Sequence, residues 1–147
     1  MFASTILVSI SILYGVYGAD PCGCTADAIS PFDLTEYLGV WHQIVVNKRF
    51  EEIYERNYPL CVYANYSLFS NGSVSVLNSG YNSEGKVNRA QGVATQSKPN
   101  TGALMVSFYG STPGPYNIIK MITDPTTNKY SIALVWSCDD NGLIQDL

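Results

Sequence analysis

The sequence predicts an all-β protein in which an antiparallel, up-and-down sheet closes into a β-barrel. Strand-like runs alternate with short clusters of Gly, Asn and Pro, and no long segment has helical periodicity. Just before the first run, Gly39 allows a tight turn where a side chain would collide. Trp41 is large enough to plug one end of a small barrel while its indole N–H donates to a carbonyl. An ordinary core tryptophan is the alternative reading.

The amino-terminal residues 1–18 have the features of a signal peptide, and residues 19–147 are long enough for one domain. An apolar stretch from Ile6 to Val16 is followed by small residues, which favours cleavage after Gly18. Serines interrupt this stretch, and no later segment approaches the ~20 apolar residues that span a bilayer. The sequence therefore predicts a secreted, extracellular protein without a membrane span.

Charge excludes some partners. The net charge is -4, and the eight Lys and Arg residues are scattered without a basic stripe. Nucleic acid and anionic membrane surfaces are therefore not expected partners. No metal-ligand spacing is present, and neither a metal nor a cofactor is predicted.

Four cysteines, Cys22, Cys24, Cys61 and Cys138, predict two disulfides in an oxidising compartment. Four cysteines allow three pairings, but Cys22 and Cys24 are too close for easy mutual bridging. We expect the amino-terminal segment to be tied to Cys61 and to Cys138.

Two glycosylation sequons begin at Asn65 and Asn71, and each predicts an exposed side chain. Asn65 is favoured because Asn71 lies in a tight turn.

Seven strands are predicted in the order of a meander. They cover residues 40–47, 60–69, 73–80, 86–95, 103–109, 116–123 and 129–138. Asn71 and Gly72 predict a type I′ hairpin turn, and residues 140–142 carry a similar signal. The longer connections at 48–59, a charged mobile flap, and 111–115, a rigid loop, should meet at the open mouth of the barrel.

Side chains alternate along a strand, so a solvent-facing Asn65 orients its neighbours. The residues predicted to point inward are Val62, Ala64, Tyr66 and Leu68, then Val74, Val76 and Asn78, then Leu104, Val106 and Phe108. On the next strand Lys120 should face water, which leaves Ile119 and Met121 inside. The last strand is apolar on both faces and cannot be oriented.

Three segments resemble the lipocalin family, most closely its apolipoprotein D-like group. They are Tyr37-Leu38-Gly39-Val40-Trp41-His42-Gln43-Ile44, then Cys61-Val62-Tyr63-Ala64-Asn65-Tyr66-Ser67-Leu68 continuing to Val76-Leu77-Asn78, then Thr123-Asp124 with Tyr130 and Leu134-Val135-Trp136-Ser137-Cys138. The resemblance implies an eight-stranded barrel that encloses one small apolar ligand. It also places the partner of Cys61 beyond Leu147.

Two departures from the family pattern shape the expectations. Five residues separate Asp124 from Tyr130, so this turn is enlarged. The chain ends at Leu147, whereas the family continues through strand H and a packed helix. The interpretation is a carboxy-terminally incomplete barrel, a truncated isoform or gene model, whose exposed edges would favour a homodimer.

The predicted function is secreted binding and transport of a small hydrophobic ligand, such as a lipid, sterol, retinoid or pigment. The candidate ligand-binding residues are Tyr66, Val76, Asn78, Val106, Phe108, Ile119 and Met121, above a floor of Gly39 and Trp41. A pigment-complex or protein-interaction subunit, and a truncated isoform with weak binding, are the alternatives. An enzyme is not expected, because His42 and Cys61 occupy structural positions and no catalytic set accompanies them.

Overall fold

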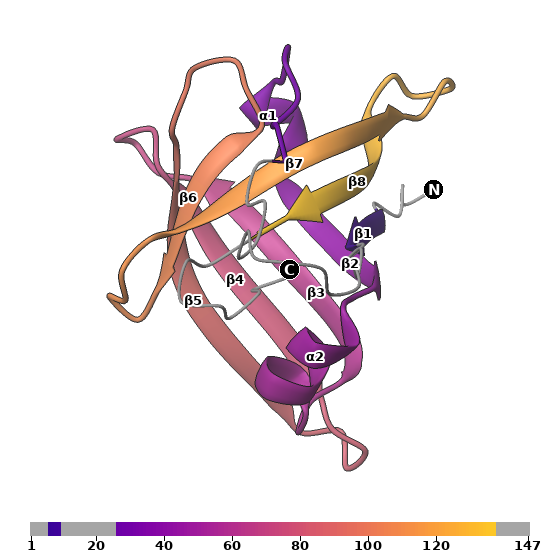
Figure 1. Cartoon of the computed structure of the whole chain (residues 1–147). Coiled ribbons are helices and arrows are strands. Elements are labelled where there is room, and N and C mark those ends of the chain that lie inside the picture. The colour runs from indigo at the N-terminus through magenta and orange to yellow at the C-terminus, as the bar shows by residue number, and fades with distance from the viewer. Residues whose placement is uncertain (1–5, 10–25, 138–147) are drawn as a thin grey trace, which may run out of the picture.

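The computed structural model describes residues 6–9 and 26–137, and within them seven antiparallel strands curl into a barrel (Figure 1). Each strand pairs with the next along the chain, as the meander predicts. The strands are β2 (Gly39–Val45), β3 (Leu60–Leu68), β4 (Val74–Tyr81), β5 (Val87–Gln96), β6 (Ala103–Phe108), β7 (Gly114–Thr123) and β8 (Tyr130–Trp136). The predicted all-β antiparallel barrel is confirmed.

A short strand, β1 (Ile6–Ser9), lies between β2 and β8 and closes the ring. It pairs in parallel with both neighbours, with Ile6 opposite His42 on one side and Ile132 on the other. This strand belongs to the segment that the sequence predicts as a signal peptide. In the structure of the whole chain, β1 covers the edges of β2 and β8, which were expected to be unpaired and to favour a homodimer. The predicted cleavage after Gly18 would remove this strand.

One end of the barrel is closed by α1 (Leu34–Tyr37; Figure 1) and by the buried side chain of Trp41. The Asp33 carboxylate caps the helix by accepting from the backbone N–H of Thr35 at 2.8 Å. Gly39 then has φ +107°, a conformation that L side chains rarely adopt. A Cβ at Gly39 would meet no atom within 4 Å, so the backbone angle, and not the predicted collision, requires glycine.

The opposite end carries α2 (Lys48–Phe50) and the π-helix η1 (Glu51–Glu55), which together we call the flap (Figure 1). The sequence predicted a charged, mobile flap over residues 48–59 and no helix. Instead, the Asn47 side chain accepts from the backbone N–H of Arg49 at 2.8 Å and starts a helix. Phe50, in α2, is buried, and its ring centroid lies 4.8 Å from that of Tyr54 in η1. These contacts hold the two helical segments of the flap together.

The β3–β4 hairpin differs from the predicted type I′ turn. A type I′ turn centred on Asn71 and Gly72 requires a positive φ at both residues; Gly72 has φ +85°, but Asn71 does not have a positive φ. The Gly72 N–H donates to the Phe69 carbonyl at 3.0 Å, and the Asn71 side chain accepts from the Ser73 N–H at 3.0 Å. A turn with negative φ at its centre, followed by a left-handed glycine, therefore joins these strands.

The inward faces of β3, β4 and β6 follow the predicted alternation, with Asn65 exposed and its neighbours Ala64 and Tyr66 buried. Leu68 is an exception. It was predicted to point inward but is 48% exposed, because β3 runs past the packed end of the barrel. On β8, which the sequence could not orient, Ala133 and Val135 are buried.

The prediction for β7 was wrong in its phase. Lys120 is exposed as expected, but Tyr116 and Ile118 are the buried residues. An irregularity in the pairing with β8 falls between Ile118 and Lys120, so the alternation restarts there. Ile119 consequently faces away from the core, whereas Met121 packs against it.

Several predictions fall outside the described residues. Cys22, Cys24 and Cys138 lie there, as do the 140–142 turn and any start of strand H. Cys61 is exposed and forms no disulfide within the part of the chain that the structure describes. Both sequon residues, Asn65 and Asn71, are exposed, but their glycosylation stays a prediction.

Candidate ligand-binding site

A cavity of about 620 Å³ lies inside the barrel and opens beside the flap. Strands β2 to β7 contribute lining residues, as do the flap and the 109–112 segment between β6 and β7. The two connections that were predicted to meet at the mouth therefore do so. Apolar lining residues include Phe50, Val62, Ala64, Val74, Val76, Ala90, Ala94, Leu104, Val106 and Phe108.

The cavity brings together most of the predicted ligand-binding residues. Those that line it are Tyr66, Val76, Asn78, Val106 and Phe108. Ile119 and Met121 do not line it. Ile119 faces away from the core, whereas Met121 packs against the buried cluster and not against the cavity.

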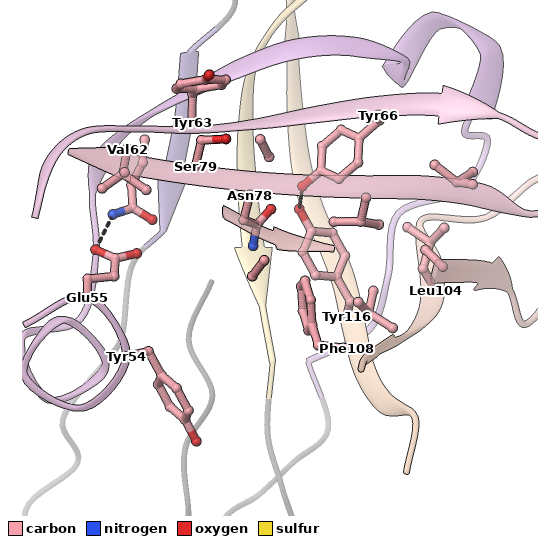
Figure 2. A pocket seen from close by; sticks show the side chains of 18 of the residues that line it. Tyr54, Glu55, Val62, Tyr63, Tyr66, Asn78, Ser79, Leu104, Phe108 and Tyr116 are labelled. Carbon is pink, nitrogen blue, oxygen red and sulfur yellow. Dashed lines mark hydrogen bonds between the residues drawn. The ribbon is translucent and has the colours of Figure 1, made fainter. Parts of the chain in front are cut away.

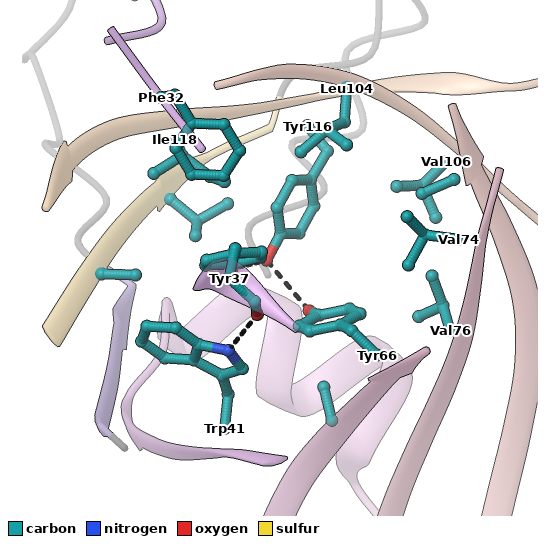
Figure 3. Packing of buried hydrophobic residues seen from close by; sticks show 14 residues of the cluster. Phe32, Tyr37, Trp41, Tyr66, Val74, Val76, Leu104, Val106, Tyr116 and Ile118 are labelled. Atoms are coloured by element: carbon teal, nitrogen blue, oxygen red, sulfur yellow. Dashed lines mark hydrogen bonds between the residues drawn. The ribbon is translucent and has the colours of Figure 1, made fainter. Parts of the chain in front are cut away.

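Three buried phenols form a polar cluster where the cavity meets the closed end (Figure 3). The Tyr116 hydroxyl lies 2.8 Å from that of Tyr37 and 3.0 Å from that of Tyr66. Burial raises the pKa of all three phenols well above the ordinary value, and their mutual proximity adds to it. They therefore stay protonated and act as neutral hydrogen-bonding groups.

Beneath this cluster lies Trp41, the residue predicted to form the floor of the barrel. It is 1% exposed, and its indole N–H donates to the Tyr37 carbonyl at 2.7 Å (Figure 3). Its ring also packs 4.6 Å from that of Tyr37. The floor and the phenol cluster are thus one packed unit.

Two polar side chains of β4, those of Asn78 and Ser79, line the cavity (Figure 2). The Asn78 Oδ1 and Ser79 Oγ atoms are buried and make no hydrogen bond with the described residues. A buried acceptor without a partner is costly, by roughly 1–3 kcal/mol. Groups of this kind are therefore candidates for contact with a bound molecule or water.

At the open end, Gln43 of β2 and Glu55 of the flap join the lining. The Gln43 Nε2 donates to the Glu55 Oε2 at 2.8 Å (Figure 2). Desolvation raises the pKa of the Glu55 carboxyl, the Gln43 hydrogen bond opposes the shift, and the nearby Glu51 charge adds to it. The flap is thus fastened to the barrel wall by a half-buried acid.

The polar lining residues that sequence reasoning missed include Tyr37, Gln43, Glu55, Ser79 and Tyr116. Tyr116 shares the inward phase of Ile118, so the correct phase of β7 would have found it. Glu55 lies in a charged segment that resembles a solvated loop, and no signal in the sequence marks it as lining a cavity. Tyr37 was noticed only as part of the segment before Trp41.

The two residues considered for catalysis lie elsewhere. His42 is exposed, and its ring centroid lies 6.1 Å from that of Tyr63 on the neighbouring strand. Neither His42 nor Cys61 lines the cavity. Among the described residues, no group of three or more His, Cys, Asp or Glu could hold a metal ion.

An antiparallel barrel with a sealed floor, an apolar cavity and an open mouth defines the class of protein. A family model described as a lipocalin-like domain matches residues 32–143. The chain therefore belongs to the lipocalin family, as its sequence motifs indicate. None of the helices in the described ranges is long and apolar enough to cross a membrane.

The chain is also similar to individual lipocalins. Outer membrane lipoprotein Blc of Citrobacter freundii is 38% identical over 125 residues, which cover 84% of this chain and 64% of the relative. Apolipoprotein D of Rattus norvegicus is 37% identical over 109 residues, which cover 73% of this chain and 52% of the relative. Blc of Escherichia coli K12 is 38% identical over 125 residues. The chain thus spans less than two thirds of the length of these relatives.

Proposed function

We propose that this protein binds a small hydrophobic molecule inside the barrel and transports it outside the cell. The observation that carries the proposal is the cavity of about 620 Å³, which is lined mainly by apolar side chains and opens beside the flap. A binding role fits this site better than catalysis, because His42 and Cys61 do not line the cavity.

Burial of apolar surface would supply most of the affinity. A ligand that buries ~300 Å² gains ~7.5 kcal/mol at ~25 cal/mol per Å². Ordering of the ligand and the flap reduces this gain, so we expect dissociation constants near the micromolar range.

We assign ligand contact to Tyr66, Val76, Asn78, Val106 and Phe108, which come from three strands around the cavity. The valines and Phe108 supply apolar surface, while Asn78 and Tyr66 orient a polar group of the ligand. Asn78 suits this role because its Oδ1 lacks a partner among the described residues.

A dye-displacement assay tests the proposal. The neutral dye N-phenyl-1-naphthylamine should gain fluorescence on binding to lipid-stripped protein and lose it when dodecanol is added. Ala90→Phe should weaken the binding of both the dye and dodecanol, because Ala90 lines the cavity and a larger side chain there fills part of it. The matched control is Gln91→Phe, since Gln91 is the next residue on β5 and is exposed. Equal binding by the two variants, with both folded, would place the dye outside the barrel and contradict the proposal.

Secretion, disulfides and glycans are part of the same proposal. The apolar leader, the four cysteines and the exposed Asn65 support it. Expression in eukaryotic cells should deliver protein to the medium with Ala19 at its amino terminus, no titratable thiol, and a glycan that Asn65→Gln removes. Retention inside the cells with the leader intact would contradict extracellular transport but leave the binding role in place.

A further inference from the structure

The charged groups at the cavity are all of one sign. Among its described lining residues, Glu55 is the one carboxylate, and no Lys, Arg or His is present. The basic residues nearest in sequence, Lys48, Arg49 and Arg56, are exposed and do not line it. A negatively charged headgroup would therefore meet no cation at the lining.

The same region offers hydrogen-bond acceptors. The Glu55 carboxylate uses one oxygen for Gln43, and a carboxylate can accept several hydrogen bonds. The Asn78 Oδ1 is a buried acceptor without a partner among the described residues, and in Figure 2 its side chain projects into the cavity between Glu55 and the Tyr66–Tyr116 pair. A ligand that donates a hydrogen bond would satisfy this acceptor.

From this arrangement the geometry points to a selectivity rule that rests on the proposed binding function. The pocket takes amphiphiles whose polar end is a neutral hydroxyl or an ammonium group, and it rejects those that end in a carboxylate. Glu55 and Asn78 are the specificity-determining residues.

The physical reason lies in the position of Glu55 at the cavity wall. A fixed negative charge beside apolar side chains acts across a medium of lower dielectric than water, so its repulsion of a second carboxylate is not fully screened. An ammonium group is attracted by the same charge, and a hydroxyl donates to Asn78 without repulsion. The neutral phenols and amides of the lining can contact any of these headgroups, so they do not discriminate by charge.

Three ligands with one alkyl chain isolate the headgroup: dodecylamine, dodecanol and dodecanoate. Their dissociation constants are measured near neutral pH, below micelle formation, by displacement of the neutral dye from the full chain. We expect dodecylamine and dodecanol to bind at least about tenfold more tightly than dodecanoate.

Two variants assign the effect. Glu55→Gln keeps a similar side-chain shape. It should tighten the binding of dodecanoate and weaken that of dodecylamine, so that the ratio of their dissociation constants shifts by about tenfold. Asn78→Leu should weaken dodecanol but leave the amine-to-carboxylate order unchanged. Glu52→Gln is the matched control, because it makes the same charge change on the flap at a side chain that is 63% exposed and does not line the cavity. It should leave all three constants within about twofold of the unmodified protein.

Each result decides the inference. Equal or tighter binding of dodecanoate by the unmodified protein overturns it, and so does a ratio that Glu55→Gln fails to move or that Glu52→Gln moves equally. Those results leave hydrophobic binding intact. Failure of all three ligands and the dye to bind overturns the proposed function itself, and the two failures are therefore distinguishable.

Discussion

The closed and open ends of the barrel differ in how tightly their side chains pack and in whether their polar groups have hydrogen-bond partners. At the closed end, Trp41 and Phe32 are 1% and 2% exposed and pack around the hydroxyl-linked tyrosines. At the open end, Gln43 and Glu55 meet over a cavity. Between them and the phenol cluster, Asn78 retains a buried acceptor without a partner among the described residues. The closed end satisfies its polar groups internally, whereas the open end leaves capacity for a bound molecule.

This difference separates stability from recognition. Filled packing at the closed end should contribute most of the free energy of unfolding, because every buried side chain there gains contacts. Residues around the cavity face empty or solvated space and gain fewer. Substitutions at the two ends should therefore change different measured quantities.

The largest expected effect is on the floor. Trp41→Ala should lower the free energy of unfolding by about 3–5 kcal/mol, because it removes a fully buried ring and its hydrogen bond to Tyr37. Urea unfolding followed by circular dichroism measures this loss. Phe50→Ala, at a 5% exposed residue of the flap, is the comparison. It should give a smaller global loss but faster amide exchange in the flap, since a short helix can open locally. Equal losses would mean that the two ends are equally integrated.

The phase of β7 offers a sharper test within one strand. Ile118→Ala should cost about 2–5 kcal/mol, because Ile118 is 0% exposed in the core. Ile119→Ala should cost well under half as much, because this half-buried neighbour faces away from the core. Paired urea titrations compare them directly. A reversed order would support the orientation first predicted from the sequence.

The inner face of β4 and the position of Trp41 show which parts of the fold the sequence could predict. The alternation of Val74, Val76 and Asn78 gave the correct inner face of β4, because these residues pair in regular register with both neighbouring strands. The irregularity in the β3–β4 pairing falls beyond them, between Leu60 and Tyr63. Trp41 could be placed because a lone large ring after a glycine has few other positions in a small barrel. Both inferences used local patterns that the fold leaves undisturbed.

The failures arose where nonlocal contacts decide the outcome. The pairing irregularity after Ile118 depends on β8, so alternation along β7 alone could not reveal it. Leu68 is apolar but extends past the packed end, where burial depends on the arrangement of the whole barrel. Glu55 reaches the cavity only because the flap folds as a helix over the mouth, and a charged segment is usually solvated. The site was therefore predicted better for its apolar wall than for its polar groups.

A medium effect is expected between the two ends, at the phenol cluster. Tyr116→Phe should lower the free energy of unfolding by about 1–3 kcal/mol, because both Tyr37 and Tyr66 lose their hydroxyl partner. Tyr66→Phe removes one of these contacts only and should cost less. Urea unfolding of both variants measures the difference. A larger loss for Tyr66→Phe would show that Tyr116 is not the central member of the cluster.

The smallest expected effect is on the pH dependence of the free energy of unfolding. Asp33 at the closed end and Glu55 at the open end should change this free energy in opposite directions as the pH rises. Hydrogen bonds from the Thr35 side chain and backbone lower the pKa of Asp33 below its ordinary value of 3.8. Its contribution to stability is therefore present above that value and is lost as the pH falls through the lower folded pKa. Desolvation raises the pKa of Glu55 above its ordinary value of 4.5. Its contribution is present below that value and is lost as the pH rises through the raised folded pKa.

Two variants separate these contributions. Asp33→Asn keeps a capping side chain, and the stability advantage of the unmodified protein over it should shrink between about pH 5 and about pH 2. The free energy of unfolding of the unmodified protein should fall relative to that of Glu55→Gln as the pH rises from about 4 to about 7. Urea unfolding at a series of pH values measures both slopes. If both stability differences change with pH in the same direction, the Glu55 carboxyl is well solvated in the folded protein. The open end then does not hold this carboxyl in a partly desolvated position, and the discrimination between ammonium and carboxylate ligands loses its physical basis.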